Sequence, residues 1–131
     1  MAFWLLKTEP STYSWSDLVK AKRAVWDGVK NPTALRNLRE MKVGDQAFIY
    51  HTGDEKQIVG IAKVVKSAYP DPKAGDDSLV VVDLEPVKPL KSPVTLASIK
   101  ADKRYAGWAL VRIPRLSVMP VEPEHWKDLA S

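Results

Sequence analysis

The sequence predicts an α+β fold in which a mixed or antiparallel β-barrel of five to six strands carries peripheral helices. Three observations favour this class. Helical patterns occur towards the two ends of the chain, β patterns dominate its middle, and Gly60 interrupts a long apolar strand pattern, where a bulge would bend the strand. With 131 residues and no linker or repeat, residues 1–131 are expected to form a single domain.

Composition narrows the class of protein. The chain is 45% hydrophobic and 27% charged, and no apolar run approaches the roughly 18 residues of a membrane span. It has no cysteine and only two histidines, so we expect an intracellular, cytoplasmic protein without disulfides, metal or other cofactor. The net charge of +4 permits a nucleic acid partner without requiring one.

The first strand and the first helix are predicted from short local signals. Residues 3–6 are a compact apolar run, which indicates a buried strand. Ser14 and Asp17 form a carboxylate variant of the capping box, so a helix should begin there and end near residues 22–23. The residues expected on its buried face are Trp15, Leu18 and Val19.

A second helix and three strands are expected next. Asn31 and Pro32 form an N-cap and first helical residue, and apolar spacing extends this helix to Lys42. β patterns then predict strands at residues 46–51, 57–69 and 78–86.

Prolines and short apolar runs organise the rest of the chain. Pro86, Pro89 and Pro93 favour extended edge segments over a regular strand ladder. A short helix capped by Thr95 should follow over residues 95–101. The remaining elements expected are strands at residues 109–113 and 116–121 and a helical turn that begins at Pro123.

The segment from Trp26 to Asn31 is the first candidate for a binding site. Trp26 precedes an Asp-Gly turn signal, so we expect it on a loop, outside the core. An aromatic face and an amide with both donor and acceptor suit recognition of a flat heterocycle, and one stacked base contributes about 1–3 kcal/mol. In the structural alternative, Trp26 packs on the end of the barrel and Asn31 only caps its helix.

Three further groups of polar residues are candidates. Tyr50, His51 and Thr52 end a predicted strand, where His51 would meet a ligand edge or a phosphate; the alternative is a hydrogen-bonded structural histidine. Lys7 and Thr8 end the first strand, and here the alternative is a solvated turn. The last group comprises Arg112, Arg115 and Ser117, which either neutralise phosphates or form a solvated basic face.

Six ordered segments together resemble one known family, the EVE domain. They are residues 3–10 (FWLLKTEP), 26–31 (WDGVKN), 38–45 (LREMKVGD), 50–52 (YHT), 68–72 (AYPDP) and 115–121 (RLSVMPV). The resemblance extends from residue 3 to about residue 126. It implies a PUA-like mixed β-barrel, in the superfamily of the ASCH domain and of the YTH readers of methylated adenine in RNA.

The resemblance also implies a site. In YTH domains an aromatic cage holds the modified base, and one cage tryptophan follows the first helix, as Trp26 does in this sequence. By analogy, the residues expected to form the pocket are Trp26, Asn31, Tyr50, His51 and Thr52. Those expected at its rim are Lys7, Thr8, Arg112 and Ser117.

The leading functional hypothesis is a monomeric, non-catalytic module that recognises a single modified base of RNA or DNA. The sequence lacks the phosphate loop, nucleophile elbow and zinc-helix motifs of common enzymes. One alternative is a nucleoside-like small-molecule sensor or hydrolase that uses the same pocket, because ASCH relatives have suspected hydrolytic roles. Another is an interaction domain whose pocket has lost its ligand.

Overall fold

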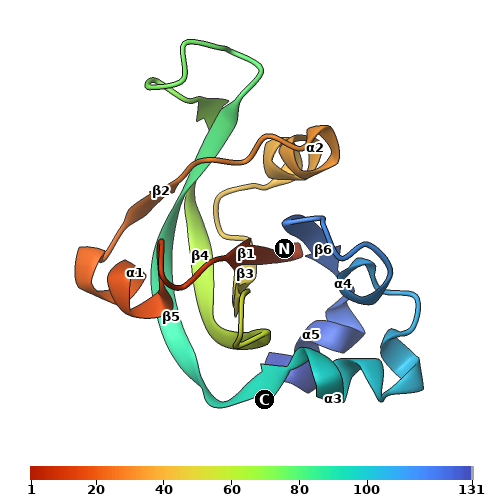
Figure 1. The fold of residues 1–131 in the computed structure, drawn as a ribbon. Coiled ribbons are helices and arrows are strands. Elements are labelled where there is room, and N and C mark those ends of the chain that lie inside the picture. Colours follow the sequence, from red (N-terminus) through yellow and green to blue (C-terminus); the bar gives the residue numbers. More distant parts are fainter. Residues whose placement is uncertain (131) are drawn as a thin grey trace.

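Six β-strands form the framework of the protein. The computed structural model describes residues 1–130, in which one mixed sheet has the order β2-β5-β4-β3-β1-β6 (Figure 1). The strands are β1 (Phe3–Thr8), β2 (Ala24–Trp26), β3 (Gln46–His51), β4 (Gln57–Pro70), β5 (Val80–Thr95) and β6 (Val118–Val121). β1 and β3 pair in parallel, and the other neighbours are antiparallel. This arrangement confirms the predicted α+β class with a mixed sheet.

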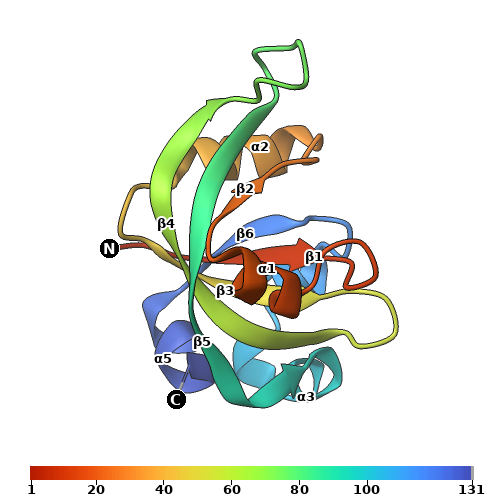
Figure 2. The same cartoon turned by 90° about the vertical axis from the view of Figure 1, so that its left-hand side faces the viewer.

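The sheet curls because its two longest strands, β4 and β5, bend along their length (Figure 2). The register of β4 shifts between Ile58 and Gly60 against both neighbouring strands, which is the predicted bulge. A Cβ atom at Gly60 would lie 2.7 Å from the ring of Trp15, so only glycine leaves room for that ring. Within residues 1–130 the strand pairing does not close into a complete barrel, and β2 and β6 remain its edges.

Helices surround the curled sheet. They are α1 (Trp15–Ala21), α2 (Pro32–Glu40), α3 (Leu96–Lys100), the 3-10 helix η1 (Lys103–Tyr105), α4 (Ala109–Arg112) and α5 (Pro123–Ala130). α2 contacts β4, β5 and β6, whereas α3 and α5 lie at the opposite end (Figure 2). Side chains of Ser14, Asn31 and Thr95 accept backbone hydrogen bonds at the helix starts, which confirms the three predicted caps.

The hydrophobic core lies inside the curl of the sheet. Leu5, Phe48 and Ile58 are fully buried on the strands, and Leu38 is fully buried on α2. The ring of Trp126 on α5 stacks on Phe48 with 4.0 Å between ring centroids, which fastens the end of the chain to the core.

The prediction of a strand at residues 109–113 is wrong. Arg112 N donates to Trp108 O and Ile113 N to Ala109 O, so this segment forms the single helical turn α4. β6 pairs with β1, and residues 109–113 pair with no strand of the sheet. They satisfy their backbone groups locally instead.

Two other expectations need correction. Separate edge segments were expected around Pro86, Pro89 and Pro93, but β5 continues to Thr95 as one ladder with β4. Register shifts between the two strands accommodate the prolines. On the other side of β5, β2 covers only residues 82–84, so the rest is an open edge on which proline is tolerated. Val19 is exposed, because α1 is buried chiefly through Leu18.

Candidate functional site

A cavity of about 550 Å³ lies between the end of β1 and β2, where the curled sheet remains open. Four parts of the chain supply its lining: the end of β1, the turn before α1, β2 with the residues after it, and the residue directly before β6. The lining residues are Lys7, Thr8, Thr12, Tyr13, Ala24, Val25, Trp26, Asp27, Gly28, Val29 and Ser117.

Trp26 forms one wall of this cavity. It is the last residue of β2, it pairs with Val82 of β5, and only 7% of its surface is exposed. The expectation that Trp26 lies on a loop outside the core is therefore wrong, since a short strand that the sequence did not predict fixes it to the sheet. Its ring packs on the core, and the same residue lines the cavity.

Tyr13 forms a second wall, which sequence reasoning missed. Its ring meets the ring of Trp26 edge-on, with 6.2 Å between centroids and 87° between planes. Thr8 Oγ1 donates to Tyr13 O at 2.6 Å, which holds the turn in place. Burial and the nearby Asp17 carboxylate raise the pKa of Tyr13, so its phenol is neutral at physiological pH. Only its position directly before the cap Ser14 marked this residue in the sequence.

Polar groups line the rest of the cavity. Lys7 N donates to Ser117 O at 2.9 Å, which brings two predicted rim residues together although 110 positions separate them. Thr8 lies beside them in the lining, and Asp27 adds an exposed carboxylate directly after Trp26. The cavity lining therefore combines two aromatic residues with residues that carry hydroxyl groups, one lysine and one carboxylate.

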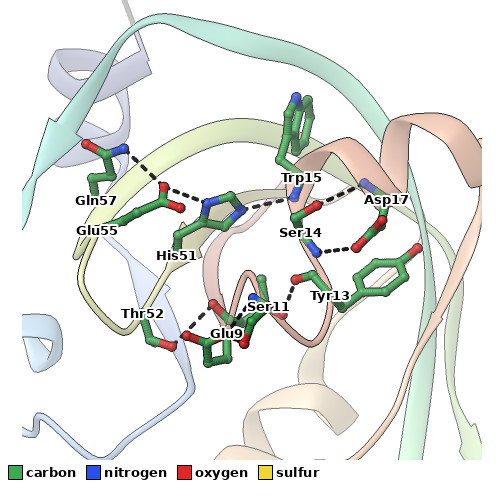
Figure 3. A network of polar contacts seen from close by, with 11 residues as sticks. Glu9, Ser11, Tyr13, Ser14, Trp15, Asp17, His51, Thr52, Glu55 and Gln57 are labelled. Carbon is green, nitrogen blue, oxygen red and sulfur yellow. Dashed lines mark hydrogen bonds and ion pairs between the residues drawn. The ribbon is translucent and has the colours of Figure 1, made fainter.

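His51 lies outside the cavity lining, in a polar network beside the start of α1 (Figure 3). Its Nε2 accepts a hydrogen bond from Trp15 N at 3.0 Å, so Nδ1 carries the proton and donates to Glu55 Oε1 at 2.9 Å. The residue is 7% exposed. Nε2 positions the start of α1, shortly after Tyr13, and Nδ1 is held by Glu55.

The remaining predicted residues lie apart from the cavity. The side-chain oxygen of Asn31 accepts hydrogen bonds from Thr33 N and Ala34 N, at 2.9 and 3.1 Å, as a helix cap. Tyr50 and Thr52 line a second hollow, which shares Lys7 with the cavity. Arg112 is exposed on α4 and lines neither space. Of the predicted set, the structure thus brings together Lys7, Thr8, Trp26 and Ser117.

A buried carboxylate supports the strand that carries Trp26. Asp83 of β5 pairs with Val25 of β2 and accepts hydrogen bonds from Arg23 and from the Tyr69 hydroxyl. Burial alone would raise the pKa of Asp83, but these two donors outweigh it and hold the pKa below its usual value. The hydrogen bond between Tyr69 and Asp83 also raises the pKa of Tyr69, to about 12.

Residues 1–130 contain neither a candidate membrane-spanning helix nor a candidate metal site. None of the helices there combines the length and the apolar character needed to cross a bilayer. In the same residues, no group of three or more His, Asp or Glu side chains is arranged to hold a metal ion.

The curled mixed sheet with its peripheral helices defines a PUA-like fold. An ASCH protein of Zymomonas mobilis shares this fold, with a TM-score of 0.63 and 13% identity over 98% of this chain and 96% of that one. The model of the EVE domain matches residues 2–131, and the chain belongs to the EVE domain family. The family resemblance of the six sequence segments is confirmed.

Relatives in the family are similar along nearly the whole chain. Mouse thymocyte nuclear protein 1 is 32% identical over an alignment that covers 98% of this chain and 72% of the relative. A Rhodopseudomonas palustris protein solved by NMR is 46% identical, with a TM-score of 0.93 over 99% of this chain and 91% of that one. Human THYN1, solved in complex with DNA containing 5-methylcytosine, is 30% identical, with a TM-score of 0.89 over 99% and 96%.

Proposed function

We propose that this protein binds nucleic acid and receives a single modified base in the cavity beside Trp26. The observation that carries this proposal is the right-angled pair of rings, Trp26 and Tyr13, on the wall of a cavity of about 550 Å³. A space of this size holds a ligand as large as a nucleoside. A base inside a duplex reaches such a pocket only when it is flipped out of the stack.

The relatives support modified cytosine in DNA as the first candidate ligand, because human THYN1 was solved in complex with DNA containing 5-methylcytosine. The lining of the cavity fits the same base. Asp27 offers a carboxylate, which is a suitable acceptor for the exocyclic amino group of cytosine. Trp26 would stack on the base, and the apolar side chain of Val29 would contact its methyl group.

The role proposed for the cavity is binding without catalysis. Its lining supplies aromatic rings, hydroxyl groups, one lysine and one carboxylate, which suit recognition of a base through stacking and hydrogen bonds. A free nucleoside presents the same base to the same walls. A titration with free 5-methyldeoxycytidine next to an oligonucleotide therefore separates a nucleoside sensor from a nucleic acid reader.

The experiment that tests the proposal uses Tyr13, because Trp26 also belongs to the core. We expect Tyr13→Ala to lower the affinity for DNA containing 5-methylcytosine roughly tenfold or more, since a lost stacking contact costs about 1–3 kcal/mol. Tyr13→Phe is the matched control, because it keeps the ring and the Tyr13 hydroxyl makes no hydrogen bond within residues 1–130. Fluorescence anisotropy measures both affinities.

Base identity is tested with Asp27. Asp27→Ala should reduce the preference for cytosine-type bases over thymine at one position of the oligonucleotide. Asp77→Ala is the control, because it removes another exposed carboxylate that lies outside the cavity and should leave this base preference unchanged. A parallel panel of DNA and RNA oligonucleotides determines which polymer binds. Equal binding of every panel member by wild-type protein and Tyr13→Ala would refute the proposed function.

A further inference from the structure

A second hollow of about 260 Å³ shares only Lys7 with the cavity beside Trp26. We name it the lysine hollow, because three lysines from three elements line it: Lys7 on β1, Lys56 before β4 and Lys100 on α3. Its other lining residues are Tyr50, Thr52, Gly53, Leu96, Leu110 and Pro114. No Asp or Glu contributes to the lining, so the hollow concentrates positive charge.

Lys7 is the most informative of these residues. Its ammonium group donates to Pro114 O at 2.9 Å and lies 5.6 Å from the centre of the Tyr50 ring. Burial lowers the pKa of Lys7, and within residues 1–130 no ion pair joins it to a carboxylate. An ammonium group has three donors, so two of them remain for a ligand. A partly buried cation without a counter-ion is stabilised by a bound anion.

The other two lysines are held close to each other by the backbone. Lys56 O accepts a hydrogen bond from Leu96 N at 2.8 Å, which fixes the β3–β4 connection against the first residue of α3, the helix that carries Lys100. Neither Lys56 nor Lys100 forms an ion pair within residues 1–130. Their charges are therefore also available to a ligand.

Hydroxyl groups complete the donor set. The Tyr50 hydroxyl makes no hydrogen bond within residues 1–130, and burial raises its pKa, so it remains a donor at neutral pH. Thr52 Oγ1 makes only a long contact of 3.4 Å with Thr8 O. Ammonium and hydroxyl donors in a lining that contains no Asp or Glu suit an oxyanion. The volume lies below the roughly 300–1,000 Å³ of pockets for organic ligands, which favours a small group.

We propose that the lysine hollow binds a phosphate group. Because Lys7 belongs to both spaces, the phosphate would be that of the nucleotide beside the base held at Trp26, and this second statement rests on the proposed function. A free phosphate ion presents the same oxygens to the same donors. The test therefore needs one probe for each source of phosphate.

The first probe is inorganic phosphate, followed by NMR of the backbone amides. We expect saturable shifts at Thr52, Gly53, Lys56 and Lys100. The double variant Lys56→Gln/Lys100→Gln should weaken binding at least tenfold, whereas Lys91→Gln/Lys127→Gln makes the same change of charge at exposed lysines outside the hollow and should leave it intact. Shifts spread over the whole surface, or equal loss in both double variants, would overturn the site.

The second probe is a short single-stranded oligonucleotide with an abasic position, which carries phosphates but no base for the cavity. The hollow variant should lower its affinity and reduce the slope of log K against log salt by roughly 0.7, the contribution of one phosphate in a single strand. If inorganic phosphate binds but this slope is unchanged, the strand source is refuted. Retained binding of the abasic strand without any base preference would refute the proposed function and support the phosphate site.

Discussion

The residues that line the cavity and the polar residues that hold the helix starts differ in what their side chains contact. Trp26 and Tyr13 present ring faces to the cavity, and the Tyr13 hydroxyl is not engaged in the fold. His51 and Asn31, which the sequence placed in the same pocket, instead bond to the chain itself: His51 to Trp15 N and Glu55, and Asn31 Oδ1 to two backbone amides of α2. A polar residue whose hydrogen bonds are already used inside the fold positions a site, whereas one with free groups is available to a ligand.

This difference separates two effects of mutation. Loss of a wall residue should lower affinity at nearly constant stability, and loss of a supporting residue should lower stability first. Tyr13 and His51 are suited to this comparison, because both lie at the start of α1 (Figure 3). Tyr13 comes two residues before the helix, and His51 accepts a hydrogen bond from the backbone N–H of Trp15, its first residue.

The largest loss of stability is expected from His51→Ala. The change leaves Trp15 N without its acceptor and opens a space next to α1, so the free energy of unfolding should fall by roughly 2–4 kcal/mol. Urea denaturation measures this loss, and amide exchange should accelerate at Trp15. His125→Ala is the control, because His125 Nδ1 is buried without a hydrogen-bond partner within residues 1–130. Equal losses in the two variants, with unchanged exchange at Trp15, would show that His51 does not hold α1.

A smaller effect is expected at Asn31. Asn31→Ala removes the cap of α2 and should cost about 1 kcal/mol, whereas Asn31→Ser keeps a capping oxygen and most of the stability. Neither variant should change the affinity for the modified base by more than about twofold, since Asn31 does not line the cavity. Lost base selectivity in the fully stable Asn31→Ser variant would instead assign the amide to base recognition.

Local signals predicted the parts of the fold that depend on neighbouring residues. Ser14, Asn31 and Thr95 were identified as caps because a cap acts on the next three residues, and Gly60 was identified because glycine interrupts an apolar strand. Residues 109–113 were assigned to a strand because a short apolar run has no helical or β period of its own. The run itself does not decide between the two structures, and in the fold its amides form hydrogen bonds within the helical turn.

The candidate site depended on contacts that no local pattern contains. Trp26 is fixed by its pairing with Val82, and Tyr13 reaches it through a turn tied to Thr8. Family resemblance grouped Trp26, Lys7, Thr8 and Ser117, and these four residues line one cavity in the structure. It did not reveal that both nitrogens of His51 are already used by the backbone and by Glu55.

The smallest expected effect concerns pH and the carboxylate behind β2. The pKa of Asp83 in the folded protein lies below its ordinary value of 3.8, because the hydrogen bonds from Tyr69 and Arg23 outweigh the effect of burial. A carboxylate with a lowered pKa stabilises the fold above its unfolded pKa, and this stabilisation is lost as the pH falls through the folded value. The Arg23 side chain is 50% exposed, so solvent weakens its share of the interaction.

Asp83→Asn tests this sign directly. Urea denaturation of both proteins at a series of pH values should give a constant difference in unfolding free energy above about pH 5 and a shrinking difference below about pH 4. Other carboxylates titrate equally in both proteins and cancel in the difference. Because Asp83 pairs with Val25, the same acid range should loosen β2 and increase the amide exchange of Trp26. A difference that stays constant down to pH 3 would show that the Asp83 carboxylate does not stabilise the strand carrying the cavity wall.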